Sequence, residues 1–295
     1  MIPEAELLRG GVLLSGCGHG SRDRTGAQQA RRHQRTLFDS VAQLYEASRL
    51  GYPSDIIEFA VATAAVGAGS EVLEVGCGTG QLTESLARYG FRLIAIDIGP
   101  SMITAARRRL DGAALSFQVS SFEDFAAADA SFDLIVSGTA FHWVDPEAMF
   151  CKPARLLRPG GWLALLETGE RYDDPLRAAL LGMWAARGGD GGTRVRGPHF
   201  ADTEVIADTG LFETAIHTTH TQRIVRPAET VVGVENTRAT SLSWPDDIRR
   251  EFTEQLRHHL RPQIEVQLTQ ETSLTMARVV PRPPLGRLET QATGR

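Results

Sequence analysis

Apolar residues along this chain follow two alternating patterns, short continuous runs and helical spacings. A strand-like apolar run at 71–75 is followed by three glycines and then by apolar residues at spacings of four and three over 82–89. A second apolar run, at 93–96, ends at Asp97. This segment is therefore predicted to form a strand, a glycine turn, a helix and a second strand with an acid at its tip.

The same alternation continues through the rest of the chain. Residues 54–66 have the pattern of a helix with Ile56, Ile57, Phe59 and Ala60 turned inward. The run at 132–137 is apolar almost throughout, which is typical of a buried parallel strand. Further strands are expected at 115–119, 163–166, 212–225 and 264–280, the last in two pieces, and further helices near 38–45, after 100, and at 145–155, 175–187, 203–208, 228–240 and 246–260.

Composition and charge narrow the class of protein. The 295 residues are 42% hydrophobic with a formal net charge of −5, so nothing indicates nucleic acid or an anionic membrane as a partner. No apolar run approaches the ~18–20 residues of a membrane helix, and we expect no signal peptide. The three cysteines are odd in number and scattered, which favours a reducing cytoplasm over a disulfide framework. No cysteine–histidine spacing suggests a metal site.

The glycine segment carries the candidate chemistry. Gly76, Gly78 and Gly80 stand at alternate positions before the predicted helix, where they permit positive φ and close approach of a ligand. The helix behind them presents unpaired N–H groups, and a carboxylate at Asp97 can accept two hydrogen bonds from a ribose diol. A dinucleotide site would place its third glycine at 81, which is Gln81 here.

These residues resemble a known family. The sequence E-V-G-C-G-T-G at 74–80, with its downstream acid, is similar to motif I of the class I S-adenosylmethionine-dependent methyltransferases. Residues 132–166, with F-H-W and R-P-G-G in order, resemble the fourth strand, helix and fifth strand of small-molecule methyltransferases. Residues 45–53 resemble the segment that precedes the fold in the trans-aconitate methyltransferase-like group. The resemblance covers roughly residues 36–281.

The resemblance implies a doubly wound, seven-stranded α/β sheet of the Rossmann-like kind. It would be mainly parallel with one antiparallel strand, and helices at about 228–260 would form a lid. The expected organisation is a mobile arm at 1–35, the methyltransferase domain at 36–281 and a disordered tail at 282–295.

The resemblance also implies roles for individual residues. Arg49 would pair with the methionyl carboxylate, although a solvated arginine is an equal alternative. Phe122 would touch the adenine, or belong to the core instead. His142 is a candidate base, or simply part of the pocket wall. The expected donor site consists of Arg49, Glu74, Gly76, Cys77, Gly78, Thr79, Gly80, Asp97, Ile98, Met102, Ser121, Phe122 and Ser137, with no metal.

The predicted function is methyl transfer from S-adenosylmethionine to an oxygen, carboxylate or hydroxyl, of a small organic acceptor. The sequence leaves open C- or N-methylation, a repurposed protein that binds S-adenosylmethionine without transfer, and, least favoured, a nicotinamide-dependent oxidoreductase. It does not determine the acceptor or the oligomeric state.

Overall fold

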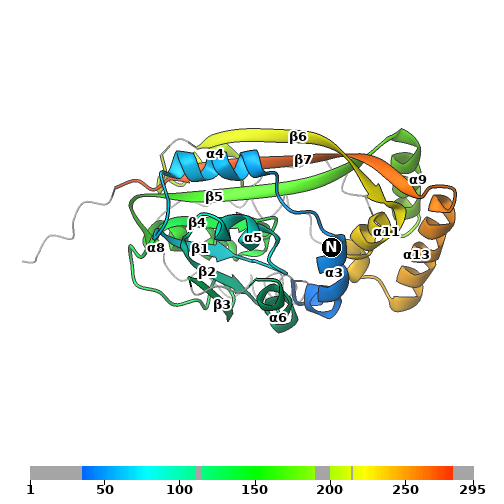
Figure 1. The fold of residues 1–295 in the computed structure, drawn as a ribbon, viewed down its shortest axis with the longest axis horizontal. Helices are drawn as coiled ribbons and strands as arrows, with labels where there is room; N and C mark the ends of the chain where they lie inside the picture. The colour runs from blue at the N-terminus through cyan, green and yellow to red at the C-terminus, as the bar shows by residue number, and fades with distance from the viewer. Residues whose placement is uncertain (1–34, 111–113, 190–199, 214, 282–295) are drawn as a thin grey trace, which may run out of the picture.

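A seven-stranded sheet runs through the whole described part of the protein. The computed structural model describes residues 35–110, 114–189, 200–213 and 215–281, so the predicted tail and all of the predicted arm except Arg35 lie outside it. The strand order is β3-β2-β1-β4-β5-β7-β6, and β7 alone runs antiparallel to the other strands of the sheet (Figure 1). This confirms the predicted fold. The strands are β1 (Glu71–Val75), β2 (Arg92–Asp97), β3 (Leu115–Val119), β4 (Phe132–Gly138), β5 (Leu157–Tyr172), β6 (Ile216–Pro227) and β7 (Glu265–Arg278).

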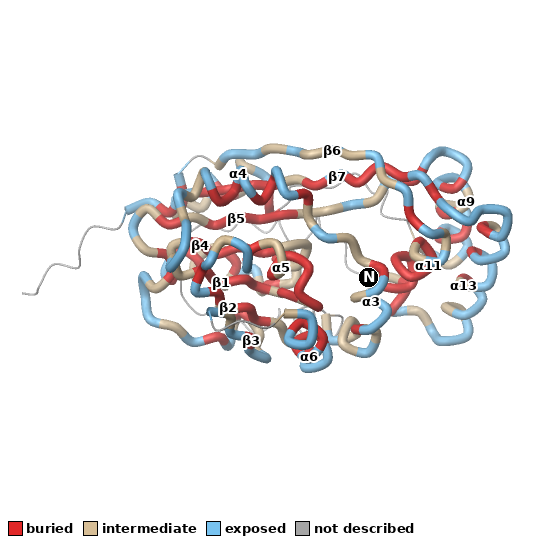
Figure 2. Tube along the Cα trace, in the orientation of Figure 1, coloured by how far each residue is buried: buried red, intermediate tan, exposed pale blue. Residues whose placement is uncertain are grey.

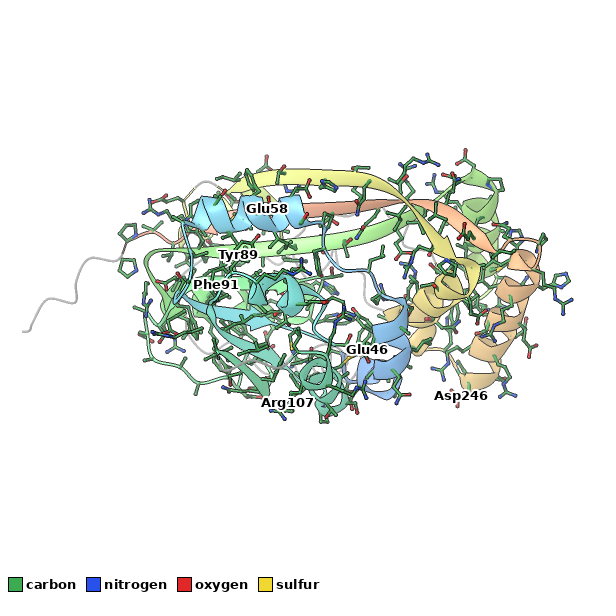
Figure 3. The ribbon with its side chains drawn as sticks, in the orientation of Figure 1. Glu46, Glu58, Tyr89, Phe91, Arg107 and Asp246 are labelled. Carbon is green, nitrogen blue, oxygen red and sulfur yellow. The ribbon has the colours of Figure 1, made fainter. Side chains whose placement is uncertain are left out.

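Helices cover both faces of the parallel half of the sheet. Adjacent residues of a strand point to opposite faces, so Val72 packs with α4 and α5 while Leu73 packs with α7, α8 and α10. The rings of Tyr89 and Phe91 stack on the face that α4 covers, with centroids 5.6 Å apart (Figure 3). The elements on these faces are α4 (Ser54–Ala64), α5 (Gln81–Ala87), α6 (Pro100–Arg109), η3 (Phe141–Trp143), α7 (Pro146–Met149), α8 (Cys151–Leu156) and α10 (Thr203–Ala207).

A second core lies at the far end of the long strands. β5 and β7 pair over residues 162–172 and 268–278, well past the parallel half. Their ends pack with helices inserted around β6, and this cluster is buried from solvent (Figure 2). The helices of this end are α9 (Asp174–Ala185), α11 (Ala228–Asn236), α12 (Ala239–Leu242) and α13 (Asp246–Leu260), and the chain enters the fold through η2 (Leu37–Val41) and α3 (Ala42–Ser48).

Several details differ from the sequence prediction, and three of them have a clear physical reason. The closing strand is continuous rather than in two pieces, because its polar centre is bonded on both sides, for example by Gln222 to Gln270 at 2.8 Å. The helix expected at 145–155 breaks at Phe150, since Pro153 has no N–H to continue the ladder. Phe59 is 42% exposed, because the buried positions of α4 lie on its other side.

Candidate functional site

The glycine turn after β1 has the geometry that its sequence predicts. Gly76, Gly78 and Gly80 all have positive φ, at +73°, +54° and +92°. A Cβ on Gly76 would lie 2.3 Å from the Cβ of Ala140, so packing alone requires glycine there. A Cβ on Gly78 would meet only Tyr45, at 3.9 Å, so the space beside it is open.

Asp97 ties this turn to the end of β2. Its Oδ2 accepts a hydrogen bond from the Gly78 N–H at 2.9 Å, and its Oδ1 accepts one from the Gly99 N–H at 2.8 Å. Burial raises the pKa of this carboxyl, and the two backbone N–H groups partly oppose that rise. Each oxygen keeps a further lone pair, so the carboxylate can hold the loop and still accept hydrogen bonds from a ligand.

Two cavities meet beyond the carboxyl ends of the parallel strands, where open α/β sheets bind their ligands. The Asp97 cavity has a volume of about 750 Å³ and the Glu74 cavity about 670 Å³, both open to solvent. We call the residues that line both of them the neck. The neck consists of Tyr45, Gly76, Gly78, Gly138 and Thr139.

The Asp97 cavity contains several predicted residues and two that the sequence did not indicate. Ile98, Met102 and Phe122 line it as expected. Arg35 also lines it and donates to Glu123 at 3.2 Å and to the Trp143 carbonyl at 3.2 Å. Sequence reasoning missed Arg35 because it stands in a polar, basic stretch with no helical pattern.

Asp39 is the second missed residue of this cavity. Its Oδ1 accepts hydrogen bonds from the N–H groups of Ser101, at 2.7 Å, and Met102, at 3.3 Å, and so caps α6 from a distant segment. Glu46 of α3, labelled in Figure 3, pairs with Arg108 of α6 at 2.8 Å. The segment 35–48 is therefore fixed over the cavity by contacts to α6.

The Glu74 cavity reaches from the glycine turn to the helical end of the molecule. Glu74 is buried and its Oε2 has no hydrogen-bond partner, and burial raises its pKa to about 8. Thr168, Gly169 and Glu170 of β5 line the opposite wall, with Val234 and Arg238 closing it from α11 and beyond. Thr168 follows the strand expected at 163–166, at the end where an acceptor could reach it. The other four wall residues were not singled out from the sequence, because only the fold brings them to β1.

Arg49 and Cys77 line the Glu74 cavity as predicted. The Arg49 guanidinium, however, is already held by the helical end: it donates to the Thr237 hydroxyl at 3.1 Å and to the Thr237 carbonyl at 2.7 Å. Arg49 thus joins α3 to the end of α11 while facing the cavity.

Four predicted donor-site residues line neither cavity. Thr79 is fully buried and bonds to Gln81 at 3.0 Å, and Gly80 lies at the start of α5 against Ala106 and Leu110. The Ser137 hydroxyl donates across the sheet to the Val75 carbonyl at 2.7 Å, and Gly138 lines the cavities in its place. Ser121 bonds to Asp124 at 2.7 Å, and the preceding Ser120 lines the Asp97 cavity.

His142 also lines neither cavity. Its ring lies against Trp143, with centroids 4.9 Å apart, and against Phe200 at 6.1 Å. In the short η3 turn it is Trp143 that faces the Asp97 cavity. His142 thus lies beside the cavity, outside its lining, and its role as a base stays a prediction.

The described residues hold no group of three or more histidine, cysteine or acidic side chains that could bind a metal ion. Over the same described ranges, no helix is both long and apolar enough to cross a membrane.

Comparison with known proteins agrees with this geometry. Residues 73–165 match the model of a family described as "Methyltransferase domain". An uncharacterized methyltransferase of Mycobacterium tuberculosis is 34% identical over 137 residues, which are 46% of this chain and 54% of that protein. A malonyl-[acyl-carrier protein] O-methyltransferase of Hahella chejuensis is 33% identical over 180 residues, 59% of this chain and 60% of the other. The alignments thus span little more than half of each relative.

Among solved structures, a candidate type II methyltransferase of Anaeromyxobacter dehalogenans has a similar fold. The TM-score is 0.54 at 22% identity, over 79% of this chain and 99% of that one. The matched residues 73–165 run from β1 to β5 and include all three glycines of the neck and Asp97. Residues 73–165 are therefore similar to methyltransferase domains, and the sheet around them has the Rossmann-like fold that is typical of class I methyltransferases.

Proposed function

We propose that this protein transfers the methyl group of S-adenosylmethionine to an oxygen of a small organic acceptor. The observation that carries the proposal is the pair of cavities that share a neck at the glycine turn. A methyl donor bound in one cavity and an acceptor bound in the other would meet at this neck.

The residues present fit the donor. Asp97 stands where a ribose diol would be held, and the apolar side chains of Met102 and Phe122 suit the adenine. At the other end, Glu74 offers a carboxyl oxygen without a partner, and Arg49 offers a cation. When bound, S-adenosylmethionine supplies a sulfonium that makes its methyl group transferable without further activation.

The chain's own residues then act mainly by placement. Holding two reactants in line in a site that excludes water removes much of the entropic barrier to a bimolecular reaction. The long strands β5 and β7 place the helical end opposite the glycine turn, and Val234 and Arg238 close the Glu74 cavity from that side. We propose residues 36–281 as the functional unit, with 228–260 as its lid.

An oxygen acceptor is favoured by the matched Hahella relative, which is named as an O-methyltransferase. The resemblance of residues 45–53 to the trans-aconitate methyltransferase-like group supports the same class. We propose a small molecule as the partner, and neither a nucleic acid nor a membrane, in a cytoplasmic setting. A nicotinamide-dependent reaction is less favoured, because Gln81 stands where a dinucleotide site would have its third glycine.

A transfer assay with a mutant control tests this function. We expect S-adenosylhomocysteine to form when the protein is given S-adenosylmethionine and a mixture of small carboxylic acids and phenols. Asp97→Ala removes two charge-assisted contacts to the ribose, worth roughly 1.5–3 kcal/mol each at most, so its KM for S-adenosylmethionine should rise at least tenfold. Equal donor KM values for the two proteins would contradict the proposed donor site.

A further inference from the structure

Thr139 combines a strained backbone with a position in the neck. It has φ +54° although its side chain is β-branched, a conformation that such residues rarely adopt. It follows β4 directly and lines both cavities. Strain of this kind persists only where the surrounding structure fixes it, and it clusters at functional sites.

The Thr139 hydroxyl is fixed by two neighbours. It accepts a hydrogen bond from the Thr168 N–H at 3.2 Å, and it lies 3.0 Å from the hydroxyl of Tyr52. Tyr52 lines the Glu74 cavity beside it. Burial raises the pKa of Tyr52 well above its ordinary value, so the phenol keeps its proton and acts as a donor.

Counting protons on this pair leaves one donor unused. If Tyr52 donates to Thr139, the threonine hydroxyl accepts two bonds and its own hydrogen has no acceptor. If Thr139 donates instead, the hydrogen of Tyr52 has none. Among the residues that the structure describes, neither hydroxyl makes another hydrogen bond. Both residues are half-buried and line cavities that open to solvent, so this hydrogen is available to a ligand that accepts one hydrogen bond at the neck.

The charges around the Glu74 cavity favour an anionic ligand. The carboxylate of Glu170 is neutralised by Arg226, at 2.6 Å, and Arg238 is paired with Glu235 by two hydrogen bonds of 2.8 and 2.9 Å. Arg49 has no acidic partner among the described ion pairs. S-adenosylmethionine adds a further net positive charge, from a sulfonium and an ammonium against one carboxylate.

The cavity also lacks a free base for a neutral hydroxyl acceptor. Glu74 keeps its proton near neutral pH, because burial raises its pKa to about 8. Glu170 is paired with Arg226 at 2.6 Å and accepts a hydrogen bond from Tyr172 at 3.2 Å, and both contacts oppose its taking up a proton. An acceptor that is ionised before it binds needs no base.

We propose that the acceptor is a small carboxylate and that the Tyr52–Thr139 hydroxyl pair donates one hydrogen bond to it at the neck. This rests on the proposed function and names its substrate class. The acceptor oxygen supplies the electron pair of the new C–O bond, the S–CH₃ bond breaks, and its electrons remain on sulfur as a neutral thioether. A methyl ester forms and no proton is transferred.

The test uses matched acceptors and four variants. Formation of S-adenosylhomocysteine is measured at saturating S-adenosylmethionine. The carboxylate acceptors are benzoate, phenylacetate, succinate and trans-aconitate, and the hydroxyl acceptors are benzyl alcohol, phenol and catechol. The variants are Tyr52→Phe, Thr139→Val, the double variant, and Thr139→Ser, which keeps the hydroxyl. Calorimetry with S-adenosylmethionine and a thermal melt accompany each variant.

The proton count predicts a non-additive result. Each single variant leaves one hydroxyl that can donate its hydrogen to the ligand, so the KM for the carboxylate should rise by no more than about fivefold. The double variant has neither hydroxyl, so its KM should rise by at least ~100-fold. The KM of Thr139→Ser for the carboxylate should be lower than that of Thr139→Val, because serine keeps the hydroxyl. Donor affinity should stay within about threefold throughout, which separates this role from general damage to the fold.

Three results would overturn the inference. The first is that only hydroxyl compounds are methylated. The second is that the protein binds S-adenosylmethionine but no carboxylate reacts or competes. The third is that the rise in KM of the double variant equals the product of the rises in the two single variants. A protein that does not bind S-adenosylmethionine at all would instead overturn the proposed function, so the two failures are distinct.

Discussion

At the scale of single residues, Gly76 and Gly78 show how neighbouring glycines serve different needs. Both were predicted as donor-site residues, and both have positive φ. Only the structure separates them, because Ala140 lies against Gly76 and open space lies beside Gly78. The sequence could predict Asp97 and the glycines because they are close along the chain. It could not predict Thr139 or Arg35, whose roles depend on contacts made by folding.

The two glycines give a matched pair of substitutions. Gly78→Ala should reduce affinity for S-adenosylmethionine at least tenfold and stability only by the φ penalty, about 1–2 kcal/mol. Gly76→Ala adds an overlap with Ala140 that is worth a further ~1–3 kcal/mol of destabilisation. Urea unfolding and calorimetry measure both quantities. Equal losses of stability, or normal donor binding by Gly78→Ala, would contradict this distinction.

Glu74 should make stability depend on pH. Its pKa is about 8 in the folded protein against an ordinary 4.5, so the native state keeps a proton that the unfolded chain releases. The free energy of unfolding should therefore fall as pH rises from about 4.5 to about 8, by at most ~1.4 kcal/mol per unit. Glu74→Gln removes this dependence and weakens donor binding.

Urea unfolding of both proteins between pH 5 and 9, without ligand, checks this. Relative to Glu74→Gln, the wild type should lose stability up to about pH 8, and the difference should then become constant. Parallel stability curves for the two proteins over the whole range would show that Glu74 is ionised in the native state.

At the scale of elements, α3 packs against α11 beside the Glu74 cavity. Gly233 of α11 packs on Ser48, and a Cβ at that position would lie 2.7 Å from the Cβ of Ser48. Arg226 donates to the Ser48 carbonyl, and Arg49 bonds to Thr237. The sequence predicted a helix at each place from apolar spacing, but not their contact, because such spacing gives no information about distant partners.

Two helical glycines test this contact. Alanine usually stabilises a helix by roughly 0.5–1 kcal/mol over glycine. Gly182→Ala in α9, where no atom lies within 4 Å of the added Cβ, should raise the melting temperature accordingly. Gly233→Ala should lower it and raise the acceptor KM. Stabilisation by both substitutions would show that α3 and α11 do not pack as described.

At the scale of the whole molecule, one sheet joins two cores. The parallel half carries Asp97 and the glycine turn, and the ends of β5 and β7 carry the helical core (Figure 1). The doubly wound, seven-stranded sheet and its single antiparallel strand were predicted through the family resemblance. The length of β5 was not predicted, because the apolar pattern marked only 163–166. The part of the strand beyond it, 167–172, is mostly polar and is held by pairing with β7.

The central claim is that the neck between the two cavities receives the methyl group of S-adenosylmethionine. Calorimetric titration of the full chain with S-adenosylmethionine, S-adenosylhomocysteine and NADH tests it most directly. We predict one-to-one binding of the first two, with a rise in melting temperature because they bind only the native state, and no binding of NADH. Binding of NADH without binding of S-adenosylmethionine would contradict the account.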